Sequence, residues 1–373
     1  MCKILVYCTD AEIFQQNRIL DGKIAADYPG ALWVTRLSEV VSKQGIKTVT
    51  GDVARLLIER EGVVASNFIL IQEECAADGI ELIKMGAIPF LITSFESPLY
   101  AYNFYKNIKT ITSKYMNRVL FSGALENVDL NGKNHALHFP CYSLMQKAEI
   151  VPWEQRKFIV MIAANKYWKL RCNSIRSFFV WLRDLSLNRK NFHTDLHLNN
   201  QLHDQRLSVI EYFGQHSEID IYGAYWRDIT NLPSEWQNRL AGILEKINPG
   251  KCADKQKTSS EYKFSICFEN LSYEGYVTEK IIDCFNAGVI PIYMGAPNIN
   301  DFVPENSFID FRDFGSLSDL NIYLKGLTNK QAMSMLDSGQ SFLKSEDGYR
   351  FSYEGFSEEV NKMLTEVIVK CSM

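Results

Sequence analysis

Hydrophobic positions along the chain form short continuous runs that alternate with longer stretches of helical spacing. The runs that predict β-strands are 3–8, 67–72, 88–93, 157–164, 218–223, 263–269 and 289–295. Helical spacing is clearest in 205–215, 277–287 and 329–344. Continuous apolar runs are typical of parallel strands that are covered on both faces. The alternation of strands and helices therefore predicts an α/β fold.

A change of pattern near residues 140–156 predicts a domain boundary. This stretch contains two prolines and no sustained periodicity, and the strand at 157–164 follows it. We expect two Rossmann-like domains, residues 1–150 and 151–350, with a ligand cleft between them and a C-terminal helix over 351–373. In such sheets, ligands bind beyond the carboxyl ends of the strands.

Residues 166–198 interrupt the second domain and look like an insertion. The segment is rich in aromatic and basic residues. It fits an amphipathic helix with a polar loop packed on the second domain, and it also fits a flap that binds an acceptor or a partner protein.

Composition narrows the class of protein. The chain has 373 residues, which suffices for two domains. A net charge of −4 argues against a general nucleic-acid binder. No run approaches the ~20 apolar residues of a membrane-spanning helix. Nine cysteines without a CxxC pair favour reduced thiols over disulfides or a structural zinc site. We expect a cytoplasmic protein, with peripheral contact at the inner face of the membrane left open.

The stretch FENLSYEGYVTEK, residues 268–280, places many polar groups between two very apolar runs. A buried strand is expected to end at Asn270, and a helix is expected to begin near Val277. Thr278 is a plausible N-cap residue, and Gly288 is a natural stop. Glu279 and Lys280 then fall in the first helical turn of a β–loop–α–β unit.

The residue types in this turn suggest a specific ligand chemistry. A helix N-terminus offers unpaired N–H groups and a positive dipole end, and Lys280 adds a charge, so the turn suits an anion. The carboxylate of Glu279 suits sugar hydroxyls, and Asn270 and Tyr276 add further donors and acceptors. The combination predicts a site for a sugar linked to a diphosphate. The plainer interpretation is a capped helix on which Glu279 and Lys280 are only solvated.

Several segments resemble one known family. Residues 262–314 resemble the signature region of the α-1,3/4-fucosyltransferases, glycosyltransferase family 10. Residues 200–226 are similar to the family segment that carries an arginine ahead of a strand ending in Tyr-Gly. The sequence FLITSFESP at 90–98 is similar to the family's Glu-Ser-Pro turn, and residues 342–356 resemble the C-terminal part of its longer bacterial members.

The resemblance implies a GT-B fold, in which two Rossmann-like domains face each other across a cleft. It implies transfer of L-fucose from GDP-fucose, with inversion, to a hydroxyl of an oligosaccharide or glycoconjugate acceptor that the first domain binds. Glu96 matches the family's general base and Arg206 its diphosphate-binding arginine. The other donor-binding positions are Asn270, Tyr276, Glu279 and Lys280, with Thr278 at the helix start.

The same resemblance implies catalysis without a metal or other cofactor. Arg206, Lys280 and the helix N-terminus are suited to the charge that develops on the leaving diphosphate. The chain also contains no D-x-D pair, the usual sequence sign of a metal-held nucleotide sugar. Two other functions stay open: the same fold with another GDP-sugar, and a catalytically silent relative that binds sugar nucleotides.

Other polar clusters have plainer explanations. His193, His197 and Asp195 have the spacing of metal ligands, but a surface loop explains them better. His135 and His138 fit packing in the hinge region. The pair Glu73–Glu74, at the end of a strand in the first domain, fits contact with an acceptor as well as the start of a helix.

Overall fold

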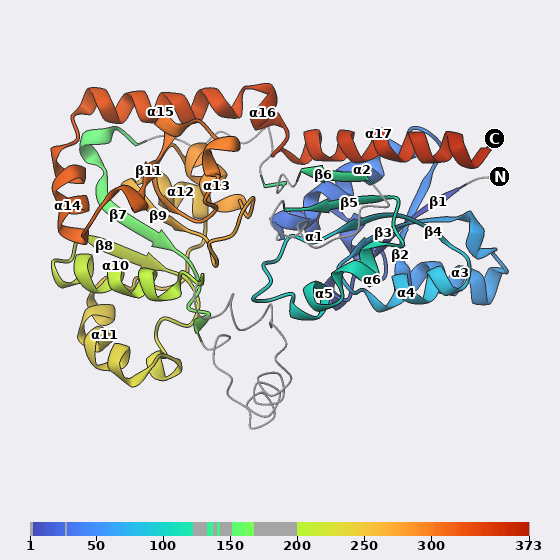
Figure 1. Cartoon of the computed structure of the whole chain (residues 1–373), viewed down its shortest axis with the longest axis horizontal. Helices are drawn as coiled ribbons and strands as arrows, with labels where there is room; N and C mark the ends of the chain where they lie inside the picture. The colour runs from blue at the N-terminus through green and yellow to red at the C-terminus, as the bar shows by residue number, and fades with distance from the viewer. Residues whose placement is uncertain are drawn as a thin grey trace. The chain divides into compact units, whose positions relative to one another are not determined.

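The computed structural model describes residues 3–26, 28–121, 133–136, 140–141, 151–167 and 200–372, and it divides the chain into two compact units (Figure 1). The first unit consists of residues 1–145 and 349–373, and the second of residues 146–348. The sequence predicted a boundary at 150 and set 351–373 apart as a separate C-terminal helix. The predicted insertion at 166–198 lies outside the described residues, apart from 166 and 167.

The first unit is built on a six-stranded parallel sheet with strand order β2-β1-β3-β4-β5-β6. The strands are β1 (Ile4–Cys8), β2 (Lys47–Thr50), β3 (Phe68–Glu73), β4 (Ile88–Thr93), β5 (Asn117–Leu120) and β6 (Lys133–Ala136). The chain order reverses beside β1, as in doubly wound folds, and ligands of such sheets bind beyond the strands' carboxyl ends.

Helices cover both faces of this sheet (Figure 1). They are α1 (Gly22–Ala26), α2 (Leu32–Ser42), α3 (Gly51–Glu61), α4 (Ala77–Lys84), α5 (Tyr102–Lys106), α6 (Ile108–Thr112) and α17 (Tyr353–Ser372). The last of them packs along α2, so the C-terminal helix is part of the first unit. Trp33, which is fully buried, meets the ring of Phe356 at 4.9 Å, and its carbonyl accepts a hydrogen bond from Ser357 Oγ at 2.9 Å. Burial of these aromatic rings stabilises the return of the chain.

The second unit has a five-stranded parallel sheet with strand order β11-β10-β9-β7-β8. Its strands are β7 (Lys157–Ile162), β8 (Ile219–Tyr222), β9 (Tyr262–Phe268), β10 (Ile290–Met294) and β11 (Ile309–Asp310). Its helices are α10 (His203–Gln215), α11 (Ser234–Ile247), α12 (Lys255–Ser260), α13 (Glu279–Ala287), α14 (Leu317–Gly326), α15 (Asn329–Leu343) and the short α16 (Glu346–Tyr349). Figure 1 shows α10 and α11 on one side of this sheet and α15 on the other.

The central strands explain why the hydrophobic runs were good predictors. The interior of β9, from Phe264 to Phe268, is buried at every position, as is β10 from Ile290 to Tyr293. Both strands lie inside the sheet and carry helices on both faces, which is the environment that continuous apolar runs predict. All seven predicted strands and all three predicted helices are present, so the predicted α/β fold is confirmed.

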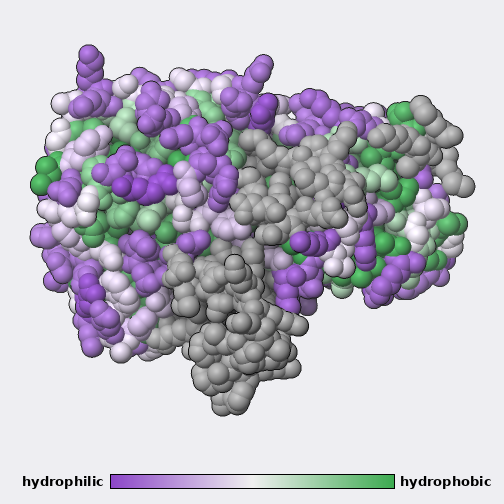
Figure 2. Space-filling model, in the orientation of Figure 1, coloured by the Kyte–Doolittle hydropathy of each residue, from purple (hydrophilic) through white to green (hydrophobic). Residues whose placement is uncertain are grey.

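The described surface is mixed in character. On the face shown in Figure 2, hydrophilic residues predominate and hydrophobic residues occur in small groups between them. In the part of the chain that the structure describes, none of the helices is long and apolar enough to cross a membrane.

Candidate functional site

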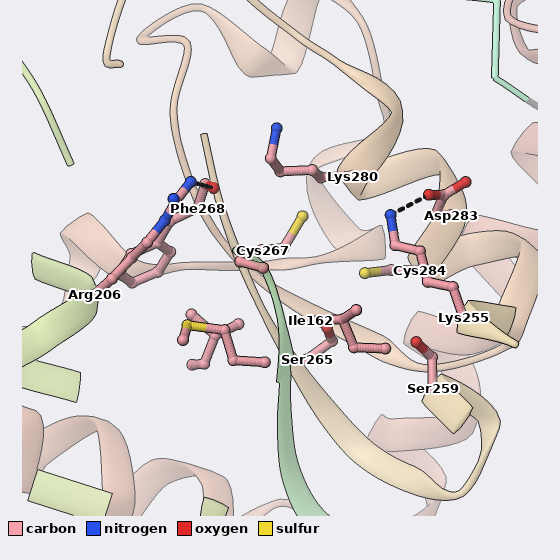
Figure 3. Close-up of a pocket in the computed structure, with 13 residues that line it drawn as sticks. Ile162, Arg206, Lys255, Ser259, Ser265, Cys267, Phe268, Lys280, Asp283 and Cys284 are labelled. Atoms are coloured by element: carbon pink, nitrogen blue, oxygen red, sulfur yellow. Dashed lines mark hydrogen bonds and ion pairs between the residues drawn. The ribbon is translucent and has the colours of Figure 1, made fainter. Parts of the chain in front are cut away.

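A pocket in the second unit lies at the ends of β7 and β9, against three helices (Figure 3). The helices α10, α12 and α13 contribute Arg206, Lys255 and Lys280 respectively. The complete lining is Met161, Ile162, Ala163, Arg206, Lys255, Ser259, Ser265, Ile266, Cys267, Phe268, Lys280, Asp283 and Cys284. The carboxyl ends of parallel strands are where ligands bind in this class of sheet. Three cations from three helices therefore meet at the expected place.

The predicted start and end of α13 are confirmed. Thr278 is the N-cap residue, Glu279 and Lys280 begin the helix, and Gly288 ends it in the left-handed conformation with φ 64°. Ile281 and Ile282 are fully buried and hold the helix against the sheet. The hydroxyl of Thr278 makes no capping hydrogen bond to the helix, although Thr is a favoured N-cap residue. The N–H groups that it would cap are thus left to another acceptor.

The Thr278 hydroxyl instead serves a buried acid, Glu269, which follows β9. This carboxylate accepts hydrogen bonds from the backbone N–H of Thr278 at 2.8 Å and from the Thr278 hydroxyl at 2.8 and 3.0 Å. It also pairs with the ammonium of Lys280 at 2.7 Å. The side chain of Glu269 is 0% exposed. Sequence reasoning noticed this residue and gave it no role.

Arg206 is anchored at the same strand end. Its Nη2 donates to the Phe268 carbonyl at 2.5 Å and to Asn270 Oδ1 at 3.1 Å. The side chain is buried on α10, with 4% exposure. The loop holding Asn270 is in turn tied to the start of α10, since the N–H of Leu202 donates to the Asn270 carbonyl at 3.2 Å. The structure thus brings Arg206 and Asn270 together, as predicted for one site.

Glu279 lies between two lysines. Its carboxylate is 3.9 Å from the ammonium of Lys280, and the side chain is 35% exposed. Lys280 and Lys255 outweigh the effect of burial and lower the pKa of Glu279 to about 2. Lys255 also pairs with Asp283 at 2.5 Å (Figure 3). Glu279 is therefore an ionised carboxylate at neutral pH, beside the positive end of the helix.

The basic groups stay charged for the same reason. Burial lowers the pKa of Lys280, but Glu269 and Glu279 outweigh burial and leave this pKa raised. Likewise, burial lowers the pKa of Lys255, whereas Asp283 and Glu279 raise it overall. The six groups comprise three cations (Arg206, Lys255 and Lys280) and three carboxylates (Glu269, Glu279 and Asp283). The charged groups that line the pocket itself are the three cations and Asp283, whereas Glu269 and Glu279 lie outside the lining, and specific partners hold the cations in place.

Two further residues of the second unit are buried. His203 was not predicted as a site residue, and Tyr276 is more buried than a donor-binding residue was expected to be. His203, at the start of α10, is 4% exposed, and burial together with Arg206 lowers its pKa to about 2. It is therefore neutral at physiological pH. Tyr276, a predicted donor-binding residue, is 1% exposed and is not among the residues that line the pocket. A buried histidine has no sequence signal that separates it from a surface histidine.

Glu96 lies in the first unit, two residues beyond the buried Ser94 that follows β4. It is exposed, and its backbone carbonyl accepts a hydrogen bond from the Tyr105 hydroxyl at 2.9 Å. This bond fixes the turn that presents the carboxylate. Glu96 also raises the pKa values of Glu73 and Glu74, so these three acids share one end of the sheet.

A second pocket at this sheet end is acidic. Its lining is Thr9, Asp10, Ala11, Glu73, Glu74, Cys75, Ala76, Tyr100, Ala101, Asn103 and Phe104. The Thr9 hydroxyl donates to Glu73 at 2.8 Å, and the Ser94 hydroxyl donates to Glu74 at 2.9 Å. Burial and the neighbouring Glu73 raise the pKa of Glu74 to about 7. Helix α4 begins at Ala77, so neither glutamate lies in its first turn, and the helix-start interpretation does not hold.

The remaining candidates add no metal site to this picture. Among the described residues, no group of three or more His, Cys, Asp or Glu side chains is arranged to hold a metal ion. The candidates His193, Asp195 and His197 lie outside the described residues, as does His138. His135 belongs to β6, and its side chain is not described. Six cysteines in the described part of the chain are free thiols.

Comparison with known families finds a match within the second unit. Residues 177–336, which are 160 of the 373 residues, match the family model described as glycosyltransferase family 10 (fucosyltransferase) C-term. The chain thus contains a segment that is similar to the fucosyltransferases of glycosyltransferase family 10. Arg206, Asn270, Thr278, Glu279 and Lys280 all fall within the matched residues, and so does the pocket lining of Figure 3 except Met161, Ile162 and Ala163.

Related sequences carry fucosyltransferase names. An alpha-(1,4)-fucosyltransferase of Arabidopsis thaliana is 33% identical over 154 residues, which cover 38% of this chain and 37% of the relative. The alpha-(1,3)-fucosyltransferase FucT of Helicobacter pylori is 41% identical over 107 residues, 28% of this chain and 22% of the relative. The matches thus span less than two fifths of these relatives. Glu96 lies outside the family match.

Solved structures show the same fold over almost the whole chain. An α1,3-fucosyltransferase crystallised with GDP-fucose superimposes with a TM-score of 0.51 at 16% identity, covering 98% of this chain and 90% of the other. A sucrose-phosphate synthase from Thermosynechococcus elongatus superimposes with a TM-score of 0.61 at 10% identity, covering 99% and 100%. This chain therefore has the two parallel-sheet α/β domains of the GT-B class, as predicted.

Proposed function

We propose that this protein is an inverting fucosyltransferase that transfers L-fucose from GDP-fucose to a hydroxyl of a glycan acceptor. One observation carries the proposal: Arg206 and Lys280, far apart in sequence, line one pocket at the N-terminus of α13 inside the family 10 domain. The fucosyltransferase names of the relatives and the GDP-fucose bound to a structural neighbour support this choice of donor.

The pocket suits a diphosphate on physical grounds. A helix N-terminus binds anions through its N–H groups and dipole, and here the N-cap hydroxyl is engaged by Glu269. An ammonium has three N–H donors, and Lys280 uses one for Glu269 and one for Thr278. The third is available to a phosphate oxygen. When the sugar leaves, charge develops on the diphosphate, and the fixed cations Arg206 and Lys280 stabilise it.

Glu279 is assigned to the sugar. Its pKa of about 2 keeps it ionised, so it accepts hydrogen bonds from fucose hydroxyls and stabilises the positive charge of an oxocarbenium-like ring. Glu96 is assigned as the general base that takes the proton of the acceptor hydroxyl. An exposed carboxylate on a turn that is held by Tyr105 suits this role.

A panel of GDP- and UDP-sugars tests the proposal. The protein is incubated with each donor and a set of oligosaccharides, and the products are identified by mass spectrometry and by the configuration of the new bond. We expect turnover of GDP-fucose with an inverted linkage. Turnover of another GDP-sugar would correct the donor, and binding without turnover would indicate a silent relative.

Divalent metal is expected to be dispensable, because Arg206, Lys280 and the α13 N-terminus supply the positive charge. Turnover in EDTA should match turnover in magnesium or manganese. Complete loss in EDTA that the metal restores would contradict this part of the proposal.

A further inference from the structure

One acid beside the pocket is completely buried and is paired with two of the predicted donor-binding residues, Thr278 and Lys280. Glu269 lies beneath the start of α13 and is 0% exposed. Its carboxylate receives three donors, namely the Thr278 N–H, the Thr278 hydroxyl and the Lys280 ammonium. Burial of an ionised carboxylate is unfavourable unless such partners compensate it. The Glu269 carboxylate therefore interacts with protein groups around it and not with solvent.

These contacts fix both parts of the anion site, the N-terminus of α13 and the Lys280 ammonium. The bond to the backbone N–H of Thr278 joins the end of β9 to the N-cap of α13, so the helix start is held against the strand. The ion pair at 2.7 Å holds the Lys280 ammonium, whereas Glu279, the neighbour in sequence, is 3.9 Å away. Thr278 Oγ1 accepts a second bond from the same ammonium at 2.8 Å. With two N–H groups held, the direction of the third is set.

The residues at the end of β10 hold Glu269 in this position. Its backbone N–H donates to the Met294 carbonyl at 2.8 Å, at the end of β10. A Cβ at Gly295 would lie 2.5 Å from Glu269 Cγ and 2.3 Å from the Tyr293 hydroxyl. The residue after β10 must therefore be a glycine if the carboxylate is to keep this place.

We infer that Glu269 is a positioning residue of the donor site, which orients the Lys280 ammonium and the N-terminus of α13 toward the diphosphate without contacting the donor. The inference rests on the proposed function for the identity of the ligand, and on the contacts above for the role of Glu269. It differs from a merely structural role because it acts through Lys280.

The NMR signal of Lys280 tests this inference without any ligand. In Glu269→Gln, the amide oxygen still accepts from Thr278, but the ion pair at 2.7 Å is lost, and Glu279 at 3.9 Å remains as a carboxylate near the ammonium. In protein labelled with ¹³C at the lysine ε-carbons, with Lys280→Met to assign the signal, we expect the Lys280 signal of Glu269→Gln at neutral pH to move toward those of the exposed lysines, because the ammonium loses its fixed partner.

GDP binding provides the second readout. At neutral pH, the GDP affinity of Glu269→Gln should fall about tenfold, because the Lys280 ammonium is no longer held toward the diphosphate. In the Lys280→Met background, the same substitution should change GDP affinity by less than about twofold, because partners in one network are not additive. The control Glu274→Gln removes an exposed acid of the same loop and should alter neither readout.

The outcomes separate this inference from the proposed function. An unchanged Lys280 signal in Glu269→Gln, or an equal loss of GDP affinity with and without Lys280, would overturn the positioning role. If the wild-type protein binds no GDP, the proposed donor is wrong, and the Lys280 signal still decides the role of Glu269. If Glu269→Gln does not fold, Glu269→Asp keeps the charge on a shorter arm. It should weaken GDP binding about tenfold while Lys280 stays charged, and a wild-type GDP affinity would again refute the role.

Discussion

The two sheet ends that carry candidate chemistry differ in how their charges are arranged. In the second unit, Arg206, Lys255 and Lys280 are each held by an acid or a carbonyl oxygen, and the helix start adds a positive dipole. In the first unit, Asp10, Glu73 and Glu74 line one pocket, and burial together with neighbouring acids raises the pKa of Glu73 and of Glu74. The first arrangement suits an anion that arrives with its own charge. The second suits a proton acceptor and hydroxyl groups.

This contrast teaches that similar parallel sheets acquire different chemistry from the residues that follow their strands. β3 and β9 both end in glutamate-containing segments, Glu73–Glu74 and Glu269. The carboxylate of Glu269 pairs with an ammonium, whereas Glu74 lies beside another acid, and burial and Glu73 raise the pKa of Glu74 to about 7.

Among the changes in the first unit, removal of the assigned base Glu96 should give the largest effect, which is a loss of turnover. Glu96→Gln should lower turnover by roughly 10²–10⁴-fold, as is typical for loss of a general base. GDP affinity should stay at the wild-type value, because the donor pocket belongs to the second unit. Turnover and calorimetric GDP binding measure the two effects. Glu61→Gln, an exposed acid at the end of α3, is the matched control.

A collapse of GDP affinity in folded Glu96→Gln would break the comparison, since Glu96 would then be a donor ligand. Wild-type turnover would remove its role as a base and direct attention to Glu74 in the neighbouring pocket.

Opposite pH dependences of stability should sharpen the contrast. The folded-state pKa of Glu74 is raised from 4.5 to about 7, so its stabilising contribution is greatest below 4.5 and is lost as the pH rises through 7. Glu74→Gln should therefore increase stability at pH 8 by about 1–3 kcal/mol. The folded-state pKa of His203 is lowered from 6.5 to about 2, so its contribution is present above 6.5 and is lost as the pH falls. Urea unfolding at several pH values measures both slopes.

In a plot of unfolding free energy against pH, His203→Gln should reduce the slope only at acid pH. Glu74→Gln should reduce the slope only near neutral pH. Parallel changes in both variants would show that the two sheet ends do not differ in this way.

Substitution of the glycines that end two helices should give the smallest effect, and it separates an effect on stability from an effect on GDP binding. Gly62 ends α3 with φ 68°, and Gly288 ends α13 with φ 64°. Alanine at either position should cost about 1–2 kcal/mol, because the left-handed conformation is unfavourable for residues with a Cβ. Thermal unfolding measures this cost. GDP affinity of the folded proteins should fall more for Gly288→Ala than for Gly62→Ala, and equal affinities would mean that the α13 start tolerates changes at its other end.

Much of the fold could be predicted because buried parallel strands leave continuous apolar runs. The strands β2, β5 and β6 were missed because their sequences KTVT, NRVL and KNHA are polar in part, and β11 has only two residues. In β5, Arg118 is fully buried and donates to the Thr112 carbonyl at 3.0 Å, a partner that only the tertiary structure supplies. Polar residues that are buried in a strand interrupt the apolar run on which pattern-based prediction depends.

The candidate site shows the same limit. Capping rules placed Thr278, Glu279 and Lys280 correctly, because helix starts are set by local sequence. No partner within the protein was predicted for Lys280, yet its ammonium pairs with Glu269 at 2.7 Å. That partner depends on the path of the loop from 269 to 278, which periodicity does not describe. The family resemblance is confirmed by the matched model, whereas the roles of the individual residues stay predictions.

The most direct test of the donor site is the affinity of free GDP for two neighbouring variants, measured by calorimetry at neutral pH. Lys280→Ala deletes a charge-assisted contact and should weaken GDP by about 10- to 100-fold. Glu279→Ala should leave GDP as tight or tighter, because it removes a carboxylate near the diphosphate, and should still abolish most transfer. An equal loss of GDP affinity in both variants would contradict the division of one ligand between phosphate and sugar contacts on which the proposed site depends.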